Sequence, residues 1–84
     1  MIYSVLILRR AQKELSDLPK DIYPRVSESL QALSNDPRPS GCLKLKGREG
    51  WRIRVGNYRV LYKIDDEQKT ITIMHIGHRR DVYN

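Results

Sequence analysis

The sequence predicts an α+β domain with the element order β-α-α-β-β-β, in which a helical hairpin packs on one face of a small, mainly antiparallel sheet. Three observations predict this class. Apolar residues change from a period of two to a helical period after residue 8, two helical segments follow in succession, and alternating segments fill the chain from residue 43. The 84 residues suit one domain, which we expect to span 1–84.

The first half of the chain predicts one strand and two helices. In residues 2–8 apolar side chains occupy both faces, which predicts a strand covered on both sides: Ile2, Leu6 and Leu8 on one face, and Tyr3, Val5 and Ile7 on the other. Ala11, Leu15 and Leu18 then form the stripe of a short helix that Pro19 ends. A second helix has a stripe of Ile22, Val26, Leu30 and Leu33, with Asp21 as N-cap and Pro24 in its first turn.

The second half predicts an antiparallel meander. A loop at 34–41, "SNDPRPSG", separates it from the helices. Three strands are predicted: the first from the alternating residues at 43–46 and 51–55, the second at 58–64 and the third at 70–77. A tight turn at Gly56-Asn57 and a polar turn at 65–69 separate them. The apolar start, "MIYSVLIL", is too short to span a bilayer, and its charges follow rather than precede it, so we expect neither a membrane segment nor a signal peptide.

The hairpin "WRIRVGNYRVLY" divides its side chains between two faces. Strand alternation places Arg52 and Arg54 opposite Trp51, Ile53 and Val55, which we expect the helices to cover. Across the turn, Arg59, Leu61 and Lys63 share the face of the arginines, although a slip of one residue would reverse the assignment. Three guanidiniums close together repel one another, which indicates either a binding site for an anion or a solvated basic surface.

The distribution of charge favours the anion. Residues 1–40 carry a net charge of +1 and residues 41–84 a net charge of +5, and residues 43–63 hold seven basic residues and one acid. A basic stripe confined to one segment is typical of a polyanion partner. The site predicted from the sequence is a concave surface lined by Arg52, Arg54, Arg59 and Arg79, with Lys44, Lys46, His78 and Tyr83 near its rim.

Other residues that could carry chemistry have simpler interpretations. His75 lies within an apolar strand and is interpreted as a structural histidine. The single cysteine, Cys42, excludes an internal disulfide, lacks the further ligands of a zinc site and suits a reducing cytoplasm.

Four motifs together resemble the RelE/ParE superfamily of type II toxins, on the RelE side. They are "LPKD", "DPRPSG", "LKLKGREGWRIRVGNYRVLY" and the terminal "GHRRDVY", and the resemblance runs from end to end. It implies a RelE-like fold and a toxin that cuts mRNA in the ribosomal A site. The basic and aromatic positions of RelE-type toxins correspond to Arg52, Arg54, Arg59, Arg79 and Tyr83, with arginine at 52 and 54 where the best-studied members have lysine.

The same resemblance implies partners and a place of action. We expect a cognate RelB-like antitoxin, the ribosome and mRNA as partners, operator DNA only through the antitoxin complex, no membrane, and a cytoplasmic location. Lys44, Lys46, Arg48 and Arg80 are the expected RNA-binding residues.

Cleavage of RNA by its own 2′-hydroxyl needs no cofactor, no metal and no protein nucleophile, so we expect a metal-independent endoribonuclease. Arginines suit the transition-state charge, but a guanidinium does not deprotonate at neutral pH. The predicted proton-transfer residues are therefore His78 and Tyr83, ahead of Lys44 and Lys46. Stacking on a base is the alternative role for Tyr83.

Two alternatives stay open. One is a ParE-like toxin that inhibits gyrase, which "GHRRDVY" disfavours. The other is a weakly catalytic toxin that acts mainly as a co-repressor with its antitoxin, which the arginines at 52 and 54 keep open.

Overall fold

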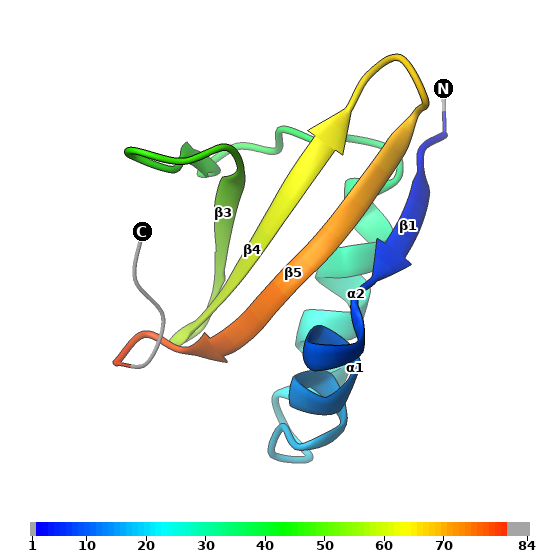
Figure 1. Cartoon of the computed structure of the whole chain (residues 1–84). Helices are drawn as coiled ribbons and strands as arrows, with labels where there is room; N and C mark the ends of the chain where they lie inside the picture. Colours follow the sequence, from blue (N-terminus) through cyan, green and yellow to red (C-terminus); the bar gives the residue numbers. More distant parts are fainter. Residues whose placement is uncertain (1, 81–84) are drawn as a thin grey trace.

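Two helices lie on one side of a five-stranded sheet in the computed structural model, which describes residues 2–80 (Figure 1). The elements in chain order are β1 (Ser4–Ile7), α1 (Arg9–Ser16), α2 (Tyr23–Leu33), β2 (Leu43–Lys44), β3 (Trp51–Val55), β4 (Tyr58–Asp65) and β5 (Thr70–His78). The strand order is β1-β5-β4-β3-β2; β1 is parallel to β5, and the other neighbours are antiparallel. The predicted α+β class, with a helical hairpin on one face of a mainly antiparallel sheet, is confirmed.

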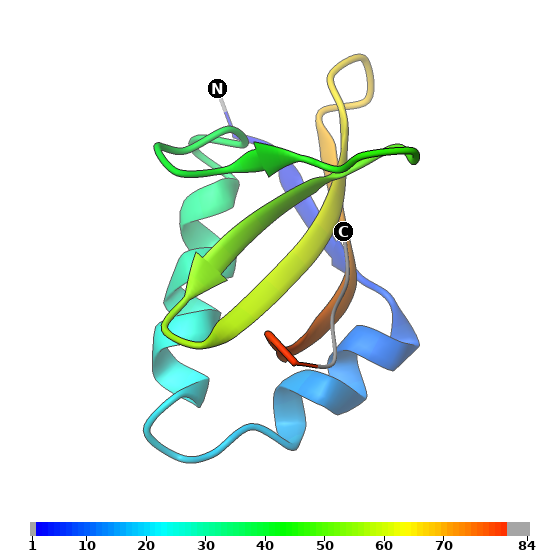
Figure 2. The same ribbon diagram turned by 90° about the vertical axis from the view of Figure 1, so that its left-hand side faces the viewer.

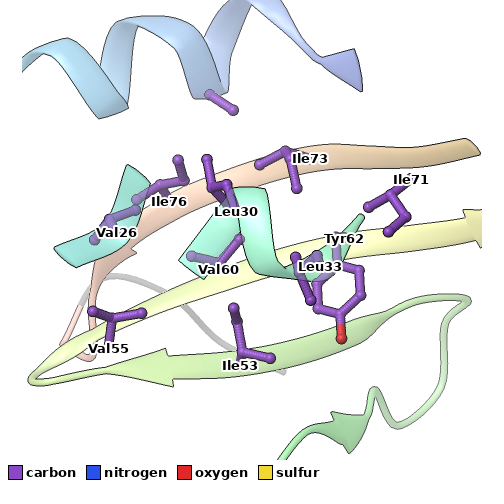
Figure 3. Packing of buried hydrophobic residues seen from close by; sticks show 11 residues of the cluster. Val26, Leu30, Leu33, Ile53, Val55, Val60, Tyr62, Ile71, Ile73 and Ile76 are labelled. Carbon is purple, nitrogen blue, oxygen red and sulfur yellow. The ribbon is translucent and has the colours of Figure 1, made fainter. Parts of the chain in front are cut away.

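The core lies between the helices and one face of the sheet (Figure 3). Its buried members are Ala11 from α1, Val26, Leu30 and Leu33 from α2, Ile53 and Val55 from β3, Val60 and Tyr62 from β4, and Ile71, Ile73 and Ile76 from β5. The predicted helix-facing side of the hairpin is therefore confirmed. The hydroxyl of Tyr62 donates a hydrogen bond to the carbonyl oxygen of Pro37 at 2.7 Å, and burial raises the pKa of this hydroxyl above its ordinary value. This bond ties the loop at 34–41 to the sheet.

The predicted helix ends need two corrections. Helix α1 ends at Ser16, and Leu18 lies beyond it because Pro19 disfavours the helical conformation in the residue before it. Asp21 is not the N-cap of α2, because the backbone amides of Ile22 and Tyr23 both donate to the carbonyl of Pro19 and form a turn that moves the cap to Ile22. Leu18 and Ile22 still pack against the core.

The prediction that β1 is covered on both sides is wrong for the residues described. Tyr3, Val5 and Ile7 pack against the core, whereas Ile2 is 72% exposed and Leu6 is 56% exposed. The helices cover only one face of the sheet, so the apolar residues on the other face of this edge strand meet solvent (Figure 1).

Four strands follow the helices where the sequence predicted three, because residues 43–46 do not continue into β3. Gly47 and Gly50 both have positive φ angles, so the chain reverses and β2 pairs antiparallel with β3. In Figure 2 the connecting loop runs across β4. There Leu45 packs with Leu61 and Met74, which form a second small apolar cluster on the face away from the helices.

Gly50 is the glycine on which this reversal depends most, and Gly50→Ala should destabilise the protein. Its φ is +134°, and a Cβ atom there would lie 2.9 Å from Leu45 Cδ1 and 3.1 Å from the Tyr62 carbonyl oxygen. We expect a loss of about 1–3 kcal/mol in the free energy of unfolding, measured by urea denaturation. Gly47→Ala is the matched control, because Gly47 also has a positive φ but open space around it. Equal losses in the two variants would contradict the steric explanation.

Among residues 2–80, neither helix is both long and apolar enough to cross a membrane.

Candidate functional site

Three arginines lie on the sheet face that points away from the helices, which we call the arginine face. Arg54 of β3 lies directly opposite Arg59 of β4, and Arg52 lies opposite Leu61 in the adjacent pair on the same face. Side chains directly opposite in an antiparallel pair have Cβ atoms about 4.5–5.5 Å apart, and like charges in such pairs are destabilising. The predicted sharing of one face by Arg52, Arg54 and Arg59 is confirmed by this register.

The sequence predicted that Arg52 points away from the core, and it does, yet it is only 6% exposed. Its neighbours on the adjacent strands are Leu43 and Leu61, so its stem is enclosed by apolar side chains on both sides. Burial, together with the positive charges of Arg59 and Arg54, lowers the pKa of Arg52. A lowered pKa in a guanidinium means that the folded protein disfavours the charged form.

No acid compensates these charges within the described part of the chain. Among residues 2–80, no carboxylate lies within 4.0 Å of Arg52, Arg54 or Arg59, and the buried Nε of Arg59 has no hydrogen-bond partner there. By contrast, Arg38 Nη2 lies 2.9 Å from Asp66 Oδ2. Buried donors without partners cost free energy unless a ligand satisfies them, so the arrangement suits an anion.

Arg79 joins this group at the end of the hairpin. Its backbone N–H donates to the carbonyl oxygen of Asn57 at 2.8 Å, which holds the residue beside the β3–β4 turn. A small polar pocket of about 40 Å³ is lined there by Arg54, Gly56, Asn57, Tyr58, Arg59 and Arg79. Three of the four predicted arginines thus meet at one pocket. Planar guanidinium forks are suited to bidentate binding of a phosphate, so a pocket lined by three arginines suits such a ligand.

The structure does not bring His78 to the arginine face. His78 pairs with Tyr58, so strand alternation places it on the side of Val60 and Ile76 rather than that of Arg59. Its ring makes an edge-to-face contact with Tyr58, with centroids 5.4 Å apart. Its Nδ1 accepts a hydrogen bond from the backbone amide of Arg80 at 3.3 Å.

The predicted RNA-binding residues are spread around the site. Lys44 pairs with Trp51 and holds its Nζ 5.6 Å from the centroid of that ring, so it lies on the helix side of the sheet. Lys46 and Arg48 are exposed on the loop between β2 and β3, and Arg80 is exposed after β5. Tyr83 lies outside the described residues.

A second group of polar side chains lies next to this face, and it includes His75, which the sequence analysis interpreted as a structural histidine. His75 pairs with Leu61 and therefore belongs to the arginine face. Its Nδ1 lies 2.6 Å from Glu14 Oε2, and its Nε2 lies 3.3 Å from Arg10 Nη2. Among residues 2–80, no three His, Cys, Asp or Glu side chains are grouped so that they could hold a metal ion.

Comparison with known proteins shows the family to which this chain belongs. A family model described as the ParE toxin of the type II toxin–antitoxin system parDE matches residues 5–83. The toxin RelG of Mycobacterium tuberculosis is 36% identical over 85 residues, covering 99% of this chain and 98% of the relative. The putative toxin RelE1 of Methanocaldococcus jannaschii is 30% identical and covers 99% of this chain and 97% of its own length.

Solved structures show the same fold. In the RelE–RelB complex of Pyrococcus horikoshii, the matching chain has a TM-score of 0.84 and 33% identity, with 98% of this chain and 100% of that chain covered. In the toxin–antitoxin complex RelBE2 of Mycobacterium tuberculosis the TM-score is 0.81 and the identity 33%, covering 94% of this chain and 100% of that chain. The chain therefore belongs to the RelE/ParE superfamily and is a RelE-like toxin of a type II toxin–antitoxin system.

Proposed function

We propose that this toxin is a ribosome-dependent endoribonuclease that cuts mRNA in the A site. The observation that carries the proposal is the pocket where Arg54, Arg59 and Arg79 converge, beside guanidiniums that have no acid partner among residues 2–80. A phosphodiester supplies the missing negative charge and several acceptor oxygens at once. The family membership supports this reading, because the arginines occupy the positions that correspond to those of RelE-type toxins.

The proposed reaction uses the nucleophile that RNA carries. The 2′-hydroxyl attacks the adjacent phosphorus, the bond to the 5′-oxygen breaks, and the products end in a 2′,3′-cyclic phosphate and a 5′-hydroxyl. Charge builds up on the phosphoryl oxygens in the transition state, where Arg54, Arg59 and Arg79 are placed to stabilise it. The ribosome would hold the mRNA in the in-line geometry that attack requires. Lys46, Arg48 and Arg80, exposed around the face, would bind the flanking backbone.

The proposal includes an antitoxin. Two of the similar structures are RelE-type toxins in complexes with their antitoxins. We propose that this chain, acting as one domain in the cytoplasm, is held inactive by a RelB-like antitoxin. An acidic antitoxin segment would neutralise the arginine face. Contact with operator DNA would come only through that complex.

The test is primer extension on mRNA in translating ribosomes, with and without the purified protein. New 5′ ends inside the codon held in the A site, absent when the same mRNA lacks ribosomes, are the expected result. Intact mRNA in both conditions would overturn the proposal.

A gyrase inhibitor is the second candidate, because the matching family model carries the ParE description. The same preparation is therefore assayed for gyrase-linked breaks in supercoiled DNA. If the arginine face acts on mRNA, we expect no gyrase-linked breaks in the DNA. Breaks in DNA together with intact mRNA would favour the second candidate.

A further inference from the structure

We infer that His75, paired with Glu14, is the general base that accepts the proton of the 2′-hydroxyl. This inference rests on the function proposed above and fills a gap in it. The arginines around the pocket do not exchange protons at neutral pH, and His78 lies on the other side of the sheet. Tyr83, the other residue predicted for proton transfer, lies outside the described residues, and within residues 2–80 His75 is the remaining histidine.

A β-bulge brings His75 to the arginine face. In β5, Ile73 pairs with Tyr62 and faces the core, and uninterrupted alternation would turn His75 the same way. The register shifts between Leu61 and Tyr62, so the strand gains one residue and both Ile73 and Ile76 face the core. His75 is thereby turned to the side of Leu61. Bulges commonly re-aim a side chain near an active site.

The distance from His75 to the arginines suits one nucleotide. His75 pairs with Leu61, and Gly77, two residues further along β5, pairs with Arg59. Diagonal neighbours of this kind lie about 7–8 Å apart. Arg52, the partner of Leu61 on its other side, lies two strand spacings from His75, or about 10 Å between backbones. With the scissile phosphate held by the long arginine side chains, the 2′-hydroxyl of the ribose on its 5′ side would lie toward the imidazole.

The neighbours of His75 indicate which ring nitrogen is available to accept a proton. A guanidinium can only donate, so the contact from Arg10 Nη2 at 3.3 Å requires a lone pair on Nε2. The ring proton is then on Nδ1, 2.6 Å from Glu14 Oε2; the N–H bond does not point straight at that oxygen, so the contact is mainly electrostatic. The other oxygen of Glu14 accepts the backbone N–H of Ile76 at 2.8 Å, which fixes the carboxylate against β5. Glu14 is thereby held beside the imidazole, where its negative charge would stabilise the imidazolium that forms on proton transfer.

Arg10 marks the place that the substrate would take. Its side chain is 69% exposed and also contacts Glu14 at 3.3 Å, so it can leave Nε2 without losing a buried position.

When RNA binds, the 2′-hydroxyl replaces the guanidinium as the donor to Nε2. The O–H bond breaks, its proton moves to Nε2, and the oxygen forms its bond to phosphorus. The leaving 5′-oxygen takes a proton from water, and the imidazolium, stabilised by Glu14, returns its proton to solvent. The charged groups facing His75 are Arg10 and Glu14 on α1 and Arg59 and Arg52 across the sheet.

The test compares single-turnover cleavage by the wild-type protein and His75→Gln across pH. Wild-type cleavage should slow at acid pH as the imidazole becomes protonated. His75→Gln should lose about 10²–10⁴ in rate together with that acid limb. Added imidazole should restore part of the rate to His75→Gly. Lys13→Gln, which removes a surface charge on the same helix, is the matched control. A His75→Gln protein with the wild-type rate and profile would overturn the inference.

Two further measurements distinguish a failure of His75 as the base from a failure of the proposed function. His78→Gln should keep the loss of rate at acid pH that the wild type shows. If His78→Gln loses this acid limb and His75→Gln keeps it, the general base is His78 and the inference is wrong. Nitrogen NMR of His75 in the free protein at neutral pH should show the Nδ1–H tautomer, and an Nε2–H tautomer would contradict the inference without any cleavage assay. Wild-type protein that leaves ribosome-bound mRNA intact overturns the proposed function and the base with it.

Discussion

Replacing Arg59 by glutamine should lower the rate of A-site cleavage by about 10²–10³ and leave the protein folded. Arg59 lines the small pocket, lies opposite Arg54, and has a buried Nε without a partner among residues 2–80. Glutamine keeps part of the length and polarity but removes the charge that faces the phosphoryl oxygens. The rate is measured under single-turnover conditions on ribosome-bound mRNA, and folding by the cooperativity of urea denaturation.

Arg38→Gln is the matched control for this experiment. Arg38 lies in the loop before β2, and its guanidinium is already bound by Asp66 at 2.9 Å. Its loss should leave the cleavage rate at the wild-type value, because an exposed, paired charge away from the pocket does not reach the phosphate. Cleavage by Arg59→Gln at the wild-type rate would show that the arginine face is not the catalytic site.

Arg52→Met should make the protein more stable and less active. Arg52 is 6% exposed, and burial and two neighbouring arginines lower its pKa. A base whose pKa is lower in the folded than in the unfolded state destabilises the fold at every pH below the folded value, which includes neutral pH. Methionine fills a similar volume without charge, so the free energy of unfolding should rise by about 0.5–2 kcal/mol. Cleavage should slow because the phosphate loses a nearby positive charge.

The companion variant is Arg52→Lys, which retains the charge in the same place. It should be less stable than Arg52→Met, because the repulsion from Arg54 and Arg59 persists. Urea denaturation of the wild type, Arg52→Met and Arg52→Lys in the same buffer gives the three free energies of unfolding to be compared. If Arg52→Met is less stable than the wild type, the charge of Arg52 does not destabilise the folded protein.

The two faces of the hairpin were predictable because features of the sequence alone determine them. Alternation with a period of two, a turn at Gly56-Asn57 and helices that must cover an apolar face assign Ile53 and Arg54 to opposite sides without any tertiary information. The burial of Arg52 was not predictable in this way. It depends on the reversal at Gly47 and Gly50 that pairs β2 with β3.

The cluster around His75 was hidden for two reasons. The bulge in β5 has no marker in composition, so the side to which the strand turns His75 cannot be read from its neighbours in sequence. Glu14 lies on a helix near the start of the chain, and a contact between distant residues leaves no local pattern. In β1, likewise, the sequence shows apolar residues on both faces, but it does not show that the helices cover only one of them.

The most direct test of the account uses an mRNA with a single 2′-deoxynucleotide immediately 5′ to the mapped cleavage position. Its all-ribose twin, programmed into the same ribosomes, provides the reference rate. If the arginine face cleaves RNA with the substrate's own 2′-hydroxyl, the wild-type protein cuts the twin and leaves the deoxy-substituted message intact at that position. Cleavage of both messages at the same position and the same rate would contradict the account.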